Sequence, residues 1–139
     1  ELARGQFDQG SDVVFAAAGG TGVGVYQAAA DSGQFAIGVD ANQNHLHPGV
    51  MLSSMVKRVD NAVYDTFMIS MNDEFEAGVF NLGLAEAGVG AAMDENNAPV
   101  VSDEMMSALG DFEEAIINGE LAVQNFTDED FSFEGSCVN

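Results

Sequence analysis

A cluster of glycines between an apolar stretch and a helix-like stretch is the feature that most restricts how this chain can fold. Four glycines fall within Gly19–Gly24, in the sequence FAAAGGTGVGVYQAAADSG. The preceding residues 12–17 (DVVFAA) form a short, apolar, β-branched run, as in a buried strand. Residues 24–31 then carry apolar side chains at helical spacing, and Ser32-Gly33 ends that pattern. A strand, a glycine-rich loop and a helix are therefore predicted in succession.

The flanking residues continue this alternation. They predict a helix that ends near residue 9, buried strands over 35–40 (FAIGVD) and 51–56, a polar loop over 41–50, and a helix over about 58–71. Strands that alternate with helices in this way favour a parallel sheet flanked by helices. The predicted fold class is therefore α/β.

The second half of the chain has a different pattern. Residues 78–84 and 88–93 predict two short strands joined as a hairpin. Ser102 is a good N-cap for a helix that ends near Gly119 and that places on one face Met105, Leu109, Phe112 and Ile116. We divide the chain into a lobe with parallel strands over 1–75 and a hairpin, helix and acidic tail over 76–139. Residues 126–139 are interpreted as an extended segment or a loose tail.

Methionines are expected mainly to fill the core, because they fall on the apolar faces of the predicted elements. The six concerned are Met51, Met55, Met68, Met71, Met105 and Met106.

The charge of the chain excludes some partners. Its 139 residues suit one domain or one lobe, and they include 23 acidic and 3 basic side chains, for a net charge of −20. Such a field repels nucleic acid and anionic membranes. No apolar run approaches the ~20 residues that span a bilayer. Near-absence of lysine favours a surface adapted to high salt, and a halophilic source, over an ordinary acidic surface.

The cysteine and histidine residues do not identify a disulfide or a metal site. Cys137 stands alone, so it cannot form an internal disulfide, and a free thiol is expected. His45 and His47 form an H-x-H pair, but no third ligand is marked, so exposed loop histidines are expected rather than a metal site. We expect no cofactor.

The glycine loop does not match the known phosphate cradles. No lysine follows it, as a P-loop requires. The dinucleotide pattern G-x-G-x-x-G fails from Gly20, where Val25 takes the last position, and from Gly22, where Gln27 does. Asp40 does lie 20 residues past Gly20, where an acid that binds ribose would stand. A Rossmann-like enzyme that binds a nucleotide cofactor therefore stays open as an alternative.

A different ligand suits the residues at the predicted strand ends. Gly19 and Gly20 follow the first strand, Asp40 ends the second and Lys57 follows the third, and parallel strands bring these ends to one edge of the sheet. Bare glycine backbone allows close approach of a ligand. A carboxylate accepts two hydrogen bonds from a vicinal diol, and an ammonium group donates to the same hydroxyls. The predicted ligand is a sugar or nucleoside, because a carboxylate would repel a phosphate.

Each of these residues also has a purely structural interpretation. The glycines would serve a tight turn with close helix packing. Asp40 would cap the following turn, and Lys57 would be solvated or salt-bridged.

Several longer segments resemble one known family. DQGSDVVFAAAGGTGVGVYQAA, FAIGVDANQN and MLSSMVKRVDNAVYD are similar to the basic membrane protein family, and GVFNLGLAEAGVGAA and INGEL also fit. These proteins are substrate-binding lipoproteins of ABC transporters and include purine nucleoside receptors. The resemblance runs over nearly all of residues 5–121.

The resemblance implies a type I periplasmic-binding-protein fold, in which two lobes clamp the ligand, and a chain that is the C-terminal portion of such a protein. It implies that Gly19, Gly20, Asp40 and Lys57 match positions that hold the ribose. It further implies an extracytoplasmic, non-enzymatic receptor that works with an ABC permease and touches the membrane only through a lipid anchor outside this sequence. A self-assembling surface protein built on the same fold is a further alternative.

The charge generates a first prediction. At molar salt the Debye length falls to ~3 Å, so repulsion between surface carboxylates is screened. We expect the melting temperature to fall as salt is withdrawn from molar to millimolar concentration, which calorimetry would measure. An unchanged melting temperature would contradict the interpretation of the surface as adapted to high salt.

Overall fold

A four-stranded sheet organises the molecule. The computed structural model describes residues 1–124. The strands lie in the order β1 (Val13–Phe15), β2 (Phe35–Asp40), β3 (Met51–Lys57) and β4 (Val89–Ala91). β1, β2 and β3 are parallel, and β4 pairs antiparallel with β3. The predicted α/β class with a parallel sheet is confirmed.

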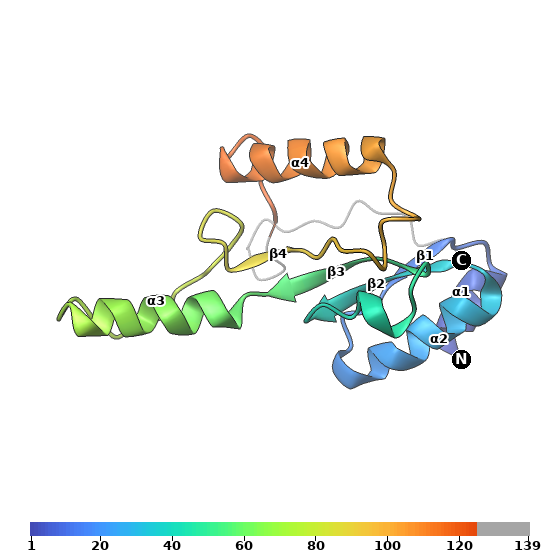
Figure 1. Cartoon of the computed structure of the whole chain (residues 1–139), viewed down its shortest axis with the longest axis horizontal. Coiled ribbons are helices and arrows are strands. Elements are labelled where there is room, and N and C mark those ends of the chain that lie inside the picture. Colours follow the sequence, from blue (N-terminus) through green and yellow to red (C-terminus); the bar gives the residue numbers. More distant parts are fainter. Residues whose placement is uncertain (125–139) are drawn as a thin grey trace.

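Helices lie on both sides of this sheet (Figure 1). Their bounds are α1 Leu2–Asp8, α2 Gly22–Ser32, α3 Val59–Met71 and α4 Asp103–Ile117, with short 3-10 turns η1 at Gly19–Thr21 and η2 at Asn44–Leu46. α1 and α2 cover one face, α4 runs along the other, and α3 projects away from the sheet. The predicted helices over 24–31 and 58–71 agree with α2 and α3 within two residues.

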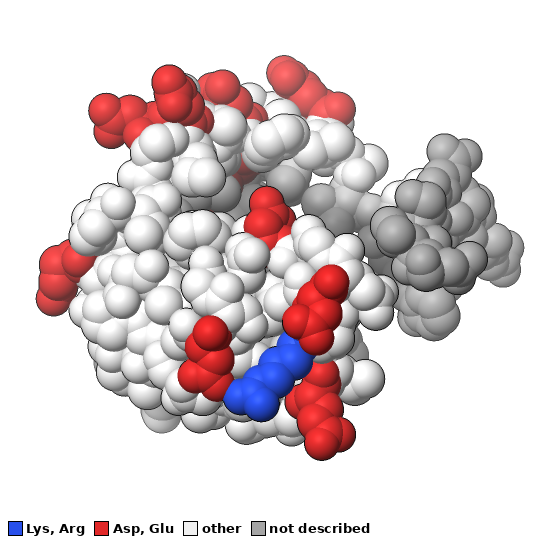
Figure 2. Space-filling view, turned by 90° about the vertical axis from the view of Figure 1, so that its right-hand side faces the viewer, with Lys and Arg blue, Asp and Glu red and all other residues white. Residues whose placement is uncertain are grey.

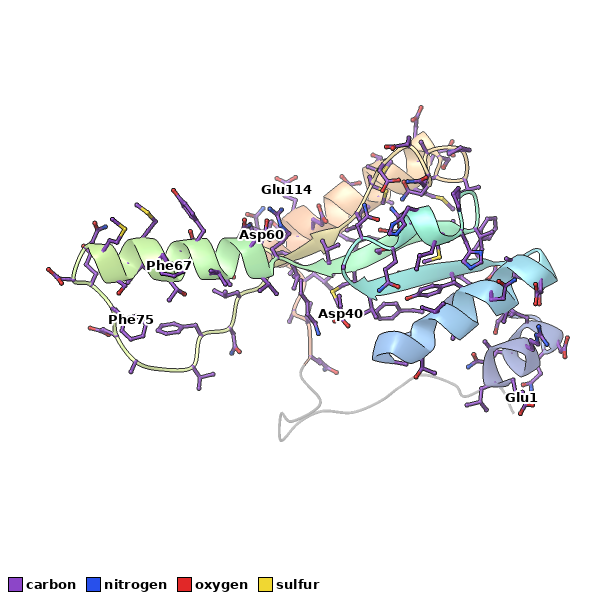
Figure 3. The ribbon with its side chains drawn as sticks, turned by 60° about the horizontal axis from the view of Figure 1, so that its bottom comes forward. Glu1, Asp40, Asp60, Phe67, Phe75 and Glu114 are labelled. Carbon is purple, nitrogen blue, oxygen red and sulfur yellow. The ribbon has the colours of Figure 1, made fainter. Side chains whose placement is uncertain are left out.

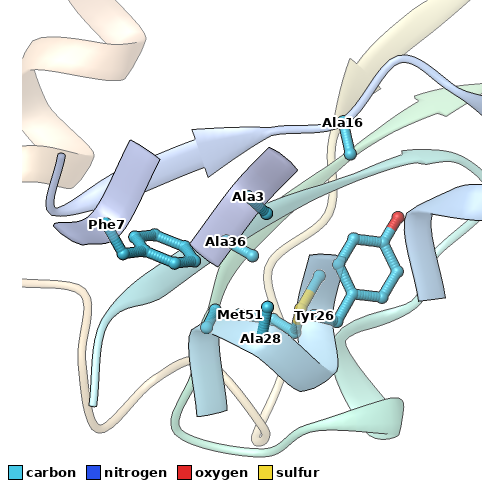
Figure 4. Close-up of a cluster of buried hydrophobic side chains, with 8 residues drawn as sticks. Ala3, Phe7, Ala16, Tyr26, Ala28, Ala36 and Met51 are labelled. Atoms are coloured by element: carbon cyan, nitrogen blue, oxygen red, sulfur yellow. The ribbon is translucent and has the colours of Figure 1, made fainter. Parts of the chain in front are cut away.

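The compact core lies between the sheet and the pair α1 and α2 (Figure 4). Its buried side chains are Ala3, Phe7, Ala16, Tyr26, Ala28, Ala29, Ala36 and Met51. The many alanines let α2 lie close against the sheet, while Phe7, Tyr26 and Met51 supply the bulk. Burial of one such large side chain contributes roughly 1.5–3 kcal/mol.

The opposite face of the sheet is packed loosely. The predicted apolar face of α4 is confirmed, since Met105, Leu109, Phe112 and Ile116 all line one cavity of ≈530 Å³ together with side chains of β2, β3 and β4. Ser102 caps this helix as predicted, because its Oγ accepts a hydrogen bond of 3.2 Å from the Met105 backbone N–H. Phe112 is nevertheless 61% exposed.

The expectation that methionines fill the core is wrong for most of them. Met51 is fully buried, but the structure leaves exposed Met68, Met71, Met105 and Met106. Their faces are apolar as the sequence pattern indicates, yet among residues 1–124 no element packs closely enough to bury them.

The predicted hairpin is also wrong. Only β4 forms, and its partner is β3 rather than residues 78–84, which have no strand structure. Val79 is 96% exposed and Phe80 is also exposed, because no neighbouring strand pairs with this segment. A turn closes instead, with the Gly88 N–H donating to the Gly83 carbonyl at 2.8 Å.

The predictions for residues 126–139 as a tail and for Cys137 as a free thiol concern residues outside the described part of the chain.

None of the described helices combines the length and apolarity that would let it cross a membrane.

The contact between Gly22 and Tyr26 generates a stability prediction. A Cβ atom at Gly22 would lie 2.7 Å from the Tyr26 hydroxyl oxygen and 3.1 Å from ring atom Cζ. We expect Gly22→Ala to lower the free energy of unfolding by about 1–3 kcal/mol, because such overpacking displaces the ring or the helix. Adding Tyr26→Phe removes the nearest atom and should restore part of the loss in a urea titration.

Gly24→Ala is the matched control in the same helix. A Cβ there meets nothing within 4 Å, so alanine should leave the stability unchanged or raise it. Equal stability of the Gly22→Ala and Gly24→Ala variants would show that the contact with Tyr26 does not constrain the fold.

Candidate functional site

The carboxyl ends of the three parallel strands meet at one edge of the sheet, as predicted. β1 is followed by the segment that leads into η1, β2 ends at Asp40 and β3 ends at Lys57. The register pairs Asp40 with Val56, the residue before Lys57. The four predicted site residues therefore stand on neighbouring strand ends or in the loop that follows one.

Asp40 and Lys57 form an ion pair at this edge. The Lys57 Nζ lies 2.7 Å from the Asp40 Oδ1, and the two side chains are 57% and 47% exposed. An ion pair that is this exposed contributes little to stability, about 0–1 kcal/mol. Lys57 is thus salt-bridged, as one of its two structural interpretations predicts, and its partner is the predicted site residue Asp40. Hydroxyl groups of a ligand could replace this contact at small cost.

The backbone at Asp40 is strained. Its φ is +72°, in the left-handed region that few residues other than glycine adopt. The Ala41 N–H donates to the Val39 carbonyl at 2.9 Å, which closes a three-residue turn around Asp40. Backbone strain of this kind costs of order 1–3 kcal/mol and concentrates at functional sites. The turn carries the carboxylate off the end of the strand (Figure 3).

A polar network holds the loop that follows Asp40. The Gln43 N–H donates to the Ser54 Oγ at 3.0 Å, and that hydroxyl donates to the Asn44 Oδ1 at 2.8 Å. Asn42 Nδ2 donates to the Asp94 Oδ2 at 2.7 Å, a bond that is the main reason why the pKa of Asp94 is below its ordinary value. Ser54 and Asn44 are fully buried. The loop is therefore fixed by satisfied hydrogen bonds, which favours a preformed edge.

The glycine loop leaves its backbone open. Gly19 has a φ of +55°, so a side chain there would be strained. At Gly20, by contrast, φ is not positive, and a Cβ would meet nothing within 4 Å. Packing within the described structure does not require glycine at position 20. The bare backbone there is consistent with close approach of a ligand.

Tyr26 packs against the start of α2, beside the glycine loop. Its hydroxyl lies against Gly22, the first residue of α2. The pKa of the Tyr26 phenol is raised above its ordinary value, mainly because the group is buried. The backbone of Val39 lowers this pKa in part, and the negative charge of Asp40 raises it further. The side chain is fully buried, and its hydroxyl has no well-formed hydrogen bond among residues 1–124. Tyr26 is not among the site residues that the sequence predicts.

All three basic side chains of the chain pair with aspartates. Arg4 lies 2.6 Å from Asp31, and Arg58 binds Asp60 at 2.8 Å, in addition to the pair at the sheet edge. The bond from Arg58 is the main cause that lowers the pKa of Asp60 to about 2. On the face shown in Figure 2, which lies at the end of the molecule away from α3, basic side chains cover only a small area and acidic ones lie beside them. At the candidate edge Lys57 is already paired with Asp40, so a neutral ligand suits this edge better than an anion.

The histidine pair falls in and after the turn η2. His45 is exposed, and His47 is half-buried. The described part of the chain contains no cluster of three or more His, Cys, Asp or Glu side chains that could hold a metal ion.

Residues 58–88, which we call the arm, leave the sheet beside this edge. The arm consists of α3 and the segment that returns to β4, and both of its ends are tied together, since the Arg58 N–H donates to the Gly88 carbonyl at 2.8 Å. Phe67 and Phe75 lie on its two limbs (Figure 3) and line the same open groove. The arm exposes many large apolar side chains: Val59, Val63, Tyr64, Phe67, Met71, Phe75, Val79 and Phe80.

A family model described as ABC transporter substrate-binding protein PnrA-like matches residues 1–127. Among curated proteins, basic membrane protein D of Borreliella burgdorferi is 38% identical over 103 residues, which are 68% of this chain and 29% of that protein. Basic membrane protein B of Borreliella afzelii is 32% identical over 127 residues, 88% of this chain and 35% of that protein. The chain thus spans about a third of the length of these relatives.

Solved structures show the same architecture. An ABC transporter system solute-binding protein from Aeropyrum pernix has a TM-score of 0.74 and 26% identity, over 93% of this chain and 44% of that one. A Bacillus halodurans protein described as a transcriptional activator of the comK gene has a TM-score of 0.77 and 25% identity, over 86% of this chain and 41% of that one.

These likenesses agree with the sheet order and flanking helices of the structure, and they confirm the family resemblance of the sequence. The chain belongs to the Bmp family, whose model describes PnrA-like substrate-binding proteins of ABC transporters.

Proposed function

We propose that this chain is part of an extracytoplasmic receptor that binds a ribonucleoside, a purine nucleoside in the first instance, and delivers it to an ABC permease. The observation that carries the proposal is the ion pair of Asp40 and Lys57, 2.7 Å apart beside the open glycine loop. The role in ABC transport rests on the family, and the nucleoside rests on the chemistry of this edge. The protein would catalyse no reaction.

The geometry supports a vicinal diol as the recognised group. A carboxylate offers about four acceptor positions, of which the contact with Lys57 uses one on Oδ1. The two hydroxyls of a ribose can therefore donate to the carboxylate, while the ammonium group of Lys57 donates to a hydroxyl oxygen. A deoxy analogue would leave one of these groups without a partner, which gives strong discrimination.

The arm supports a two-lobed receptor. It exposes an apolar surface beside the candidate site, and a surface of this kind marks an interface. The Aeropyrum solute-binding protein contains more than twice the length that this chain matches. We expect the arm to pack against a second lobe, with the two linking segments near Arg58 and Gly88 acting as a hinge. Closure of such a hinge would trap the ligand at the sheet edge.

The cellular location follows from the same family. The matched relatives include an uncharacterized lipoprotein of Pyrococcus furiosus, 38% identical over 59% of this chain. We expect the receptor to be held at the outer face of the membrane by a lipid anchor outside these 139 residues.

The central test replaces the carboxylate at Asp40 in the native protein that contains this sequence. Asp40→Asn is preferable to alanine, because asparagine tolerates a positive φ and the substitution changes charge rather than backbone. We expect the Kd for guanosine, measured by calorimetry, to rise about 10- to 100-fold, since hydrogen bonds to a charged group are worth about 1.5–3 kcal/mol each.

Asp31→Asn provides a matched control. Asp31 is also an aspartate in an exposed ion pair, with Arg4 on α1, but it lies at the other end of α2. Its substitution should leave guanosine binding unchanged. Unaltered affinity in the Asp40→Asn variant, or an equal loss in both variants, would rule out the assignment of Asp40.

A second test addresses the glycine backbone. Gly20→Ala should leave the melting temperature unchanged, because the added Cβ meets open space. It should weaken guanosine binding, because that methyl group occupies the space through which the ligand approaches. Gly110→Ala on α4, where a Cβ also meets open space, should affect neither quantity. Full binding by the Gly20→Ala variant would remove the loop from the site.

A further inference from the structure

The Tyr26 hydroxyl is a buried polar group without an evident structural use. Tyr26 is fully buried in the core, yet its hydroxyl makes no well-formed hydrogen bond among residues 1–124. Leaving such a group unsatisfied destabilises a folded protein, whereas phenylalanine would fill the same space without that loss. The hydroxyl therefore requires an explanation.

The position of the Tyr26 hydroxyl suggests an explanation. In Figure 4 the hydroxyl stands at the end of the ring that points away from Phe7. On one side it meets the glycine loop, where a Cβ on Gly22 would be 2.7 Å away. On the other side it is close enough to Val39 and Asp40 for both to influence its ionisation. Tyr26 thus lies near two of the elements that present the candidate site residues.

We propose that Tyr26 is a positioning residue of the nucleoside site and that its hydroxyl donates a hydrogen bond to the Asp40 carboxylate when ligand hydroxyls draw that carboxylate away from Lys57. The inference rests on the proposed function and adds to it a residue that does not itself touch the ligand.

The turn at Asp40 explains why such support is needed. Its positive φ and three-residue hydrogen bond hold the backbone in a conformation that is sparsely populated on its own. The ion pair with Lys57 is exposed and weak, so it cannot hold the carboxylate by itself. We expect the buried ring of Tyr26 at this edge of the sheet to limit how far the carboxylate can move, and its hydroxyl to compensate the charge as Lys57 turns to the ligand.

The experiment is a double-mutant cycle in the native protein that contains this sequence. The variants are Tyr26→Phe, Asp40→Asn and the two combined, and calorimetry measures the Kd for guanosine and for 2′-deoxyguanosine. Tyr26→Phe should weaken guanosine binding about 3- to 10-fold and leave the weaker binding of 2′-deoxyguanosine unchanged. In the Asp40→Asn background its effect should be smaller, because a neutral amide oxygen accepts a hydrogen bond more weakly than a carboxylate.

A control and a spectroscopic signal accompany the cycle. Asp31→Asn, on the far end of α2, should leave both affinities unchanged. In protein labelled only at tyrosine, the ring resonances of Tyr26 are those that Tyr26→Phe removes. Guanosine should shift these resonances, and Asp40→Asn should reduce the shift.

The outcomes separate the two proposals. Guanosine binding that is indifferent to Tyr26→Phe would overturn this inference alone. An equal loss for both nucleosides, or the same loss in the Asp40→Asn background, would show that Tyr26 only packs the core. Failure of the unmodified protein to bind any ribonucleoside would overturn the proposed function, and this inference with it.

Discussion

The parallel pairing of β2 with both of its neighbours is the constraint on which the geometry of the site depends. Parallel strands bring their carboxyl ends to one edge, so the glycine loop, Asp40 and Lys57 become neighbours although they are far apart in sequence. The register adds a second condition. It shifts by one residue between Ala36 and Ile37, and without that irregularity Asp40 would pair with Met55 rather than Val56. A bulge near Leu52 thus sets which residue of β3 stands beside the carboxylate.

The periodicity of the sequence predicts this half of the fold well because its signals are local. β2 is the run FAIGVD with the predicted bounds, and the helices that follow the glycine loop and Lys57 agree with the structure within two residues. The position of Asp40 and Lys57 at one edge also follows from topology alone. The residue types of Asp40 and Lys57 predict which groups they offer a ligand. They do not predict that the two side chains lie 2.7 Å apart, because that contact depends on the register of β2 and β3.

The errors of the sequence analysis share a physical cause. Residues 78–84 have the apolar composition of a short strand, and Met71 and Met105 lie on apolar faces, but burial depends on partners as well as pattern. In the described chain the arm and the outer face of the sheet lack close-packed partners. Tyr26 and the strained turn at Asp40 were missed for another reason. An unsatisfied hydroxyl and a positive φ are properties of coordinates, and neither a tyrosine in a helix nor an aspartate after a strand signals them.

Weak pairing at the site is consistent with reversible binding. If Asp40 were buried against Lys57, a ligand would have to break a desolvated ion pair, and much of its binding free energy would be lost. Half-exposed partners exchange one contact for another at small cost, so the gain from the hydroxyls remains available for affinity. Selectivity then cannot come from the pair alone. It requires that the carboxylate keep its place when the pair opens, and we infer that the ring of Tyr26, fully buried against the glycine loop, provides that rigidity.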